Sequence, residues 1–482
     1  MKLKTIVVFA YVVPLLVAVG NANARPANQD RNTHRKQPNV LFIAVDDLKP
    51  VLGCYGNELA ITPSLDRLAA QSTLFLNAYC QFPVCGGSRA SLMTGLRPES
   101  TGVMDLKTNM RAKNPDVVTI PQYFRQNGYA TTGVGKIYDP RCVDNRTTND
   151  KPSWSIPFSG VQNSKIKFGK MKPVVLAPDV DDTDLTDGSI ARKGLELLRD
   201  LSQNPEKPFF LAVGFKKPHL PFVAPKKYWD LYDPDTIKLA EHRGGIKNAS
   251  GYSIHDSNEF RGYEGVPENG PISEELQRKS IHGYLACVSF VDAQVGLLMQ
   301  ELKKLGIDDN TIVIVWSDHG FHLGDHCMWG KHSTLENAAR VPLMIRTIGD
   351  NFVAEIHSPV ELVDIYPTLA ESCGLPGPTA INGRSLVPLI TAKTKHVRDG
   401  ALTIFKKRGS LGYSFRTQRF RYTQWVNKDS EIVAKELYDY EVDPNETINV
   451  ANLPSYLEIQ STLAHQLRSH AQGCERFRSI RN

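Results

Sequence analysis

The sequence predicts an α/β protein with a large, mainly parallel sheet flanked by helices, followed by a small C-terminal α+β domain with an antiparallel sheet. Two observations predict this fold class. Apolar, β-branched runs alternate with helical stretches through most of the chain. After residues 391–395 that alternation gives way to short strand-like runs and one last helical stretch. We therefore expect a large domain at 38–392 and a small one at 396–482.

The individual elements follow from periodicity. Apolar residues at helical spacing, such as Leu65 and Leu68, indicate helices, and short apolar runs bounded by turn residues indicate strands. In the large domain we expect strands at 39–45, 129–133, 209–213, 311–316 and 341–345, and helices at 63–71, from Ser88, at 120–126, 190–201, 273–305 and within 358–372. In the small domain we expect strands at 401–405, 413–417 and 420–424 and a helix at 457–471.

Two long segments, 140–185 and 225–272, show weak periodicity and are rich in Pro, Gly, Asp, Lys and Asn. Loops of that length in a compact protein are usually functional or disordered. We expect them to form the rim of a cleft and to select its substrate.

Size and composition exclude some classes of function. The chain has 482 residues, of which 41% are hydrophobic and 22% charged, as in ordinary globular proteins. Its net charge of +6 suits acidic substrates but falls far short of a nucleic-acid-binding signature. We expect no nucleic-acid partner.

The N-terminus has the pattern of a secretory signal. Lys2 and Lys4 precede a mostly apolar stretch, and the Ala22-Asn23-Ala24 tripeptide fits the small-residue cleavage rule. The apolar stretch is shorter than the roughly 20 residues that a membrane span needs. We expect cleavage of residues 1–24 near Ala24, a flexible lead at 25–37, and a secreted or periplasmic protein without a stable membrane span.

Two of the expected strands end in side chains that suit a metal ion. One runs into Asp46 and Asp47, the other into Asp318 and His319. Ligands in open α/β sheets gather beyond the carboxyl ends of strands. Adjacent carboxylates are hard oxygen donors for Ca²⁺ or Mg²⁺. We expect both strand ends to face one cleft and to form a metal site.

A cysteine and an arginine stand four residues apart, at Cys85 and Arg89. If a helix opens near Ser88, Cys85 sits at its N-terminus, where backbone N–H groups favour an anion. Arg89, about one helical turn further on, can then reach back towards Cys85. The pair is suited to hold a tetrahedral anion against a reactive side chain. The alternative is a buried structural cysteine beside a helix start.

This segment resembles the sulfatase family, whose pattern is Cys-x-Pro-x-Arg followed by a Leu/Met-Thr-Gly stretch. The chain matches at Cys85, Arg89 and the Thr94-Gly95 pair, and it differs at Gly87, where the family has Pro or Ala. In the family a modifying enzyme oxidises the cysteine to formylglycine, the catalytic nucleophile. The resemblance implies this conversion at Cys85 by a formylglycine-generating or sulfatase-maturating enzyme. Because Gly is flexible where Pro is rigid, we expect partial conversion that Gly87→Pro would raise.

Further segments match the same family in the same order. The two acidic strand ends lie where the family carries its metal ligands, which gives that role to Asp46, Asp47, Asp318 and His319. The Gly-Lys segment ending in Lys136 and the Trp-Gly-Lys segment ending in Lys331 resemble those that bear the sulfate-binding lysines. His219 matches the histidine that serves the leaving group.

One family position is changed. Most members place a histidine two or three residues after the first lysine, where this chain has Tyr138 and Asp139. The sequence does not identify a replacement for that histidine.

The resemblance covers nearly all of the chain after the expected signal and is closest to iduronate-2-sulfatase-like members. It rests on Val45-Asp46-Asp47-Leu48, on 215–222 and on His319. It implies an alkaline-phosphatase-like fold, one Ca²⁺ per chain and hydrolysis of a sulfate ester. The expected substrate is a sulfated carbohydrate.

Two other functions stay open at this point. A phosphoesterase of the same superfamily would typically use Thr or Ser as nucleophile and two zinc ions. A non-catalytic protein that binds sulfated glycans would result if Cys85 were not converted. His322 and His326 lie in the loop that follows His319. For these two residues we favour substrate contact or simple loop polarity over metal binding.

Overall fold

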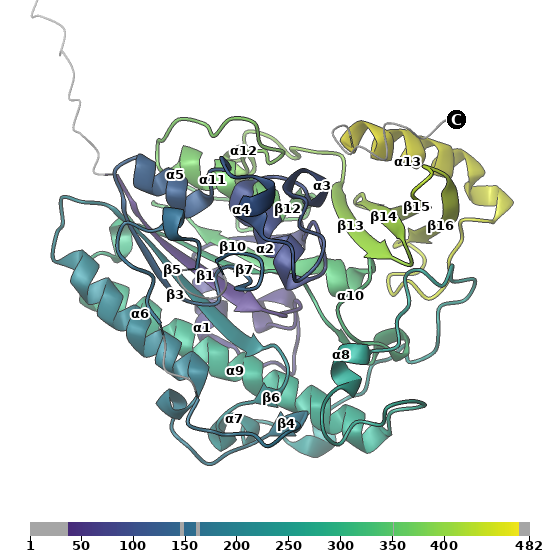
Figure 1. The fold of residues 1–482 in the computed structure, drawn as a ribbon, viewed down its shortest axis with the longest axis horizontal. Coiled ribbons are helices and arrows are strands. Elements are labelled where there is room, and N and C mark those ends of the chain that lie inside the picture. The colour runs from purple at the N-terminus through teal and green to yellow at the C-terminus, as the bar shows by residue number, and fades with distance from the viewer. Residues whose placement is uncertain (1–36, 145–148, 161–163, 350, 472–482) are drawn as a thin grey trace, which may run out of the picture. The chain divides into compact units, whose positions relative to one another are not determined.

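The structure is a computed structural model that describes residues 37–144, 149–160, 164–349 and 351–471. Its centre is an eight-stranded sheet in the order β11-β2-β10-β7-β1-β5-β3, with β12 beside β2 (Figure 1). The strands are β1 (Asn39–Asp46), β2 (Thr73–Tyr79), β3 (Ala130–Gly135), β5 (Phe209–Pro218), β7 (Thr311–Ser317), β10 (Arg340–Arg346), β11 (Glu355–Ile356) and β12 (Val360–Glu361).

The sheet is mainly parallel, as the sequence predicts. Strand β1 pairs in parallel with β5 and with β7, and β3 pairs in parallel with β5. Strand β10 runs antiparallel to its neighbours β7 and β2. The carboxyl ends of β7, β1 and β5 therefore meet at one edge of the sheet.

Helices cover both faces of the sheet because alternate residues of its central strand face opposite sides. Leu41 and Ile43 of β1 pack in one apolar cluster, and Val40 and Phe42 in the other. Figure 1 shows α6 and α9 running side by side along one face, with α5 and α11 on the opposite side. The larger helices are α1 (Pro63–Ala69), α6 (Thr186–Ser202) and α9 (Glu274–Lys304) on the first face, and α2 (Cys85–Thr94), α5 (Ile120–Gln126) and α11 (Ile365–Ser372) on the second.

A second, four-stranded antiparallel sheet follows in the C-terminal part of the chain, as predicted. Its order is β13-β14-β15-β16, and α13 packs on it through Leu463 and Leu467. Its backbone joins the central part directly, because Ile404 N–H donates to the Gln81 carbonyl at 2.8 Å. The bounds are β13 (Ala401–Lys407), β14 (Ser410–Arg416), β15 (Phe420–Val426), β16 (Ile432–Asp439) and α13 (Leu457–His470).

Short elements connect these layers. The short strands are β4 (Val175–Leu176), β6 (Phe222–Val223), β8 (His322–Leu323) and β9 (Trp329–Gly330). The short helices are α3 (Pro98–Thr101), α4 (Met110–Lys113), α7 (Lys226–Trp229), α8 (Asn258–Arg261), α10 (Glu336–Ala339) and α12 (Val387–Ile390).

The expected signal segment 1–24 and all of the expected lead except Gln37 lie outside the described residues. Within the described residues, α9 is the helix long and apolar enough to cross a membrane, and 83% of its apolar window is buried inside the protein. This burial is what a core helix requires, and α9 indeed packs against α1, α6 and β5.

Candidate active site

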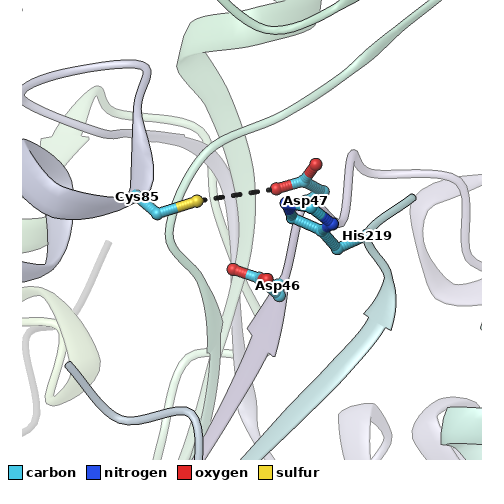
Figure 2. Close-up of side chains that lie close together, drawn as sticks. All are labelled: Asp46, Asp47, Cys85 and His219. Atoms are coloured by element: carbon cyan, nitrogen blue, oxygen red, sulfur yellow. Dashed lines mark hydrogen bonds between the residues drawn. The ribbon is translucent and has the colours of Figure 1, made fainter. Parts of the chain in front are cut away.

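The predicted metal-binding side chains meet at the carboxyl ends of adjacent strands. In the register of the sheet, Val45 lies beside Ser317 and Asp46 beside Pro218. The residues that follow each strand therefore converge. Figure 2 shows Asp46 and Asp47 at the end of β1, with His219 entering from the end of β5 and Cys85 from α2.

Cys85 is the first residue of α2 and is buried, with 2% of its surface exposed. Its Sγ lies 3.3 Å from Nε2 of His319 and 3.9 Å from Oδ1 of Asp47. Burial, reinforced by Asp46, raises the pKa of the Cys85 thiol well above its usual range. An unconverted Cys85 is therefore a neutral thiol surrounded by charged groups.

The four predicted metal ligands surround this sulfur. Asp46, Asp47, Asp318 and His319 are all at most 1% exposed. Ligand atoms of Asp46, Asp47, Cys85 and His219 lie within 4.8 Å of one another, as do those of Cys85, Asp318 and His319. Buried carboxylates need a compensating positive charge. A donor set of three carboxylates and one imidazole fits a hard divalent cation.

Arg89 supplies part of that compensation. Its Nε donates to Oδ2 of Asp318 at 2.8 Å and its Nη2 to Oδ1 of Asp46 at 2.9 Å. Its Nη1 donates to the carbonyls of Lys136 and Ile137 at 2.6 and 3.0 Å. The guanidinium is fully buried, and these hydrogen bonds go to carboxylates and backbone carbonyls rather than to Cys85. This geometry favours a role in holding Asp46 and Asp318 in place.

The two predicted sulfate-binding lysines flank the same carboxylates. Nζ of Lys136 lies 2.6 Å from Oδ2 of Asp46, and Nζ of Lys331 lies 2.8 Å from Oδ2 of Asp47. Burial opposes ionisation of Asp46, but Lys136 and Arg89 outweigh it and hold its pKa well below the usual range. Both lysines line the cleft beside Cys85, where they can contact a bound anion.

His219 stands on the turn that follows β5, and Lys217 supports that turn. Nζ of Lys217 donates to the carbonyls of His219 and Pro221, at 2.6 Å each. Nδ1 of His219 lies 2.7 Å from the carbonyl oxygen of Leu220, so Nε2 is the ring nitrogen left to face the site. Burial lowers the pKa of His219.

A cleft of about 940 Å³ is lined by Asp46, Cys85, Lys136, His219 and Lys331 of this site. The long segments at 140–185 and 225–272 contribute to its walls, as predicted, through Arg141, Phe168, Lys172 and Tyr263 among others. A cleft of this size accommodates one or more sugar units.

The wall after Lys136 differs from the family pattern in its charge. Asp139 is buried and accepts two bonds from Arg141, 2.9 Å from Nε and 2.7 Å from Nη2. Arg141 also lines the cleft with Cys85. The cation presented on this side is therefore a permanently charged guanidinium.

Two acidic residues of the site were not predicted from the sequence. Asp187, at the start of α6, is buried and accepts from the backbone N–H of Lys216 at 2.5 Å and of Lys217 at 3.1 Å. Glu259 contacts both His219 and Lys331. A lone acidic residue gives no sequence signal, either at the start of a helix, as for Asp187, or in a segment of weak periodicity, as for Glu259, so only the fold could reveal these contacts.

Comparison with protein families decides the identity of this site. The model of the family described as "Sulfatase" matches residues 38–375. The chain belongs to the sulfatase family. A second model, described as "N-sulphoglucosamine sulphohydrolase, C-terminal", matches residues 324–473. The chain is thus a sulfuric ester hydrolase, and this family generally uses a formylglycine and a divalent metal.

Relatives of known name agree with this assignment. Iduronate 2-sulfatase of Mus musculus is 34% identical over 86% of this sulfatase and 91% of the relative. The Homo sapiens enzyme is 32% identical over the same shares of the two chains. A protein named Sulfatase from Formosa agariphila is 34% identical over 86% of this chain and 83% of its own.

Solved structures show that the fold is shared. A structure in complex with its substrate D-glucosamine-2-N,6-O-disulfate superposes with a TM-score of 0.75 at 23% identity, over 92% of this chain and 98% of that one. The phosphonate monoester hydrolase of Agrobacterium radiobacter also reaches 0.75 at 23% identity, over 90% and 96%. The predicted alkaline-phosphatase-like fold is thereby confirmed.

Proposed function

We propose that this sulfatase hydrolyses sulfate esters on a uronic-acid-containing, glycosaminoglycan-like carbohydrate, using a formylglycine made from Cys85 and one calcium ion. The observation that carries the proposal is the position of Cys85, which opens α2 and faces the carboxylates of Asp46 and Asp47 (Figure 2). The similarity to iduronate 2-sulfatases over 86% of the chain supports the substrate class.

The proposed calcium ligands are Asp46, Asp47, Asp318 and His319. A divalent ion there would stabilise the negative charge that develops on the sulfate in the transition state. A formylglycine at Cys85 would supply a hydrated aldehyde as the oxygen nucleophile, which a thiol cannot provide.

The remaining steps belong to side chains of the cleft. Lys136 and Lys331 would bind the sulfate oxygens, since both ammonium groups line the cleft beside Cys85. Arg89 would keep Asp46 and Asp318 aligned through its two ion pairs. His219 would protonate the departing alcohol as general acid from its imidazolium form, which carries a proton on Nε2 as well as on Nδ1 and which the neighbouring carboxylates of Asp47 and Glu259 favour.

We also propose export, because the N-terminal pattern is that of a cleaved signal. The protein would then act outside the cytoplasm, after cleavage near Ala24. Sequencing the N-terminus of the protein secreted by its host tests this directly.

The proposed chemistry predicts three results for one preparation of the purified protein. Mass spectrometry of the peptide containing Cys85 should reveal formylglycine, and elemental analysis should find one calcium per chain. Sulfated uronic-acid oligosaccharides should be turned over, whereas the corresponding phosphate esters should react far more slowly. Two zinc ions per chain, or a preference for phosphate esters, would instead favour a phosphoesterase. An unconverted Cys85 in active protein would exclude formylglycine catalysis.

A second prediction separates the two lysines that precede His219. Both lysines line the cleft, but the ammonium of Lys217 donates to two backbone carbonyls of the turn. Lys216→Ala should therefore raise KM for a uronate-bearing sulfate several-fold and weaken its salt dependence, because exposed charges are screened over about 8 Å at physiological ionic strength. Lys217→Ala should instead lower kcat, because the His219 turn loses its support. Steady-state kinetics at two salt concentrations will show whether the variants differ in this way; identical effects would contradict it.

A further inference from the structure

Glu259 is held rigidly next to the sulfate-binding end of the cleft. It belongs to the short helix α8, whose neighbour Ser257 accepts from the N–H of Trp329 through Oγ at 2.8 Å. The ring of Phe260 stacks on Trp329, with centroids 4.7 Å apart. Because Trp329 lies two residues before Lys331, these contacts fix Glu259 relative to that lysine.

The carboxylate of Glu259 contacts two functional side chains at once. Its Oε2 lies 3.0 Å and its Oε1 3.2 Å from Nζ of Lys331. Its Oε1 also lies 3.4 Å from Nε2 of His219. Burial opposes ionisation of Glu259, but Lys331 and His219 outweigh it and lower its pKa, so the group is a carboxylate.

Glu259 provides a second contact for each of the two side chains, Lys331 and His219. Lys331 is otherwise held by Asp47, at 2.8 Å, which would draw its ammonium towards the metal-binding carboxylates. Among the described residues, the other hydrogen bond of the His219 ring joins Nδ1 to the Leu220 carbonyl. With Glu259 present, each side chain is fixed from two sides.

We propose that Glu259 is a positioning residue that sets the orientation of the general acid His219 and of the sulfate-binding Lys331. This inference rests on the roles given to His219 and Lys331 in the proposed function. Glu259 itself takes no part in bond making. It holds the Nε2 edge of the imidazole where the leaving oxygen departs, and it fixes the Lys331 ammonium from the side opposite its ion pair with Asp47.

Comparing kcat on substrates with different leaving groups distinguishes a positioning role from a merely structural one. An alkoxide of a sugar needs a well-placed acid, whereas 4-nitrophenolate departs with little help. Glu259→Ala should therefore lower kcat by about 10²-fold on a sulfated uronic-acid disaccharide, the lower end of the range for general acid catalysis. On 4-nitrophenyl sulfate the loss should be several-fold. Glu259→Gln, which keeps an acceptor oxygen, should recover part of the loss.

Glu268→Gln is the matched control, because Glu268 is an exposed acid on the same segment. It should leave both rates unchanged. Equal losses on the two substrates in Glu259→Ala would overturn the positioning role. A lower KM for the uronate substrate with unchanged kcat would also overturn it, by showing that Glu259 merely repels anionic substrates.

A crystal structure of Glu259→Ala separates this inference from the proposed function, because it requires no turnover. The His219 ring and the Lys331 ammonium should shift from their wild-type positions, because each has lost its contact with the Glu259 carboxylate. Unchanged positions of both would refute the inference even in an active sulfatase. If the wild-type enzyme hydrolyses neither ester although these shifts occur in the variant, the proposed function is refuted. The positions of His219 and Lys331 would then have no catalytic consequence.

Discussion

Asp318→Ala is expected to abolish sulfate-ester turnover and to destabilise the protein. The carboxylate accepts from Nε of Arg89 at 2.8 Å and from the N–H groups of Asp47 and His319 at 3.2 and 3.1 Å. Its removal leaves a buried guanidinium with one carboxylate partner fewer, which typically costs about 3–5 kcal/mol of unfolding free energy. Turnover should fall by about 10³-fold or more, because the metal ion that would stabilise the negative charge on the sulfate loses one of its proposed ligands.

Two measurements test this prediction. Denaturant unfolding gives the free-energy loss, and calcium titration of the thermal midpoint reports metal binding, since a ligand that binds only the native state stabilises it. The wild type should show a calcium-dependent rise of the thermal midpoint, and the variant should lack it. Asp309→Ala is the control, because Asp309 is exposed and lies just before the opposite end of β7. Retained turnover in Asp318→Ala would contradict the assignment of this ligand.

The sequence could predict this site because its chemistry lies at strand ends. Residues 39–45 and 311–316 are apolar enough to be recognised as buried strands. The acidic residues that directly follow each run break its apolar pattern and therefore stand out as candidates for function. Parallel pairing of β1 with β7 then brings Asp46 and Asp318 together. The same reasoning identified α5 and the long α9 within a residue of their bounds.

Other features depend on contacts that sequence patterns do not encode. Strand β2 was not predicted, because Thr73–Tyr79 mixes polar Asn77 into an apolar run without a clear period. The reversed direction of β10 is set by its neighbours β7 and β2 rather than by its own residues. Glu259 acquires its partners only when α8 packs against Trp329.

Gly87 shows how packing changes an expectation drawn from a motif. The sequence predicts that Gly87→Pro would raise conversion of Cys85, since the family has Pro there. In the structure, a Cβ at position 87 would lie 2.6 Å from Cδ1 of Phe82 and 2.9 Å from the carbonyl oxygen of Val103. The Phe82 ring is itself buried and packs against Phe405, with centroids 5.7 Å apart. The space that a proline ring needs is therefore occupied.

Gly87→Pro should consequently raise conversion of Cys85 and yet lower the stability of the folded sulfatase. The backbone itself tolerates proline there, because the helix's first hydrogen bond runs from the N–H of Ser88 to the carbonyl of Val84. The cost comes from overpacking, typically about 1–3 kcal/mol and more where a backbone oxygen cannot move. Mass spectrometry of the total protein gives the converted fraction, and denaturant unfolding gives the stability.

A double-mutant cycle with Phe82→Leu isolates the cause of this destabilisation. If the Phe82 ring is the obstacle, the smaller side chain should relieve part of the strain, and the two substitutions should be non-additive by about 0.5–3 kcal/mol. Gly87→Ala, which adds the Cβ without the ring of proline, should show a smaller version of the same coupling. Additive losses in both pairs, or a Gly87→Pro variant as stable as the wild type, would show that Phe82 does not restrict this position. The expected coupling would mean that the Phe82 ring occupies the space that a proline at position 87 needs. A proline there would then be accommodated without strain only beside a smaller side chain at position 82.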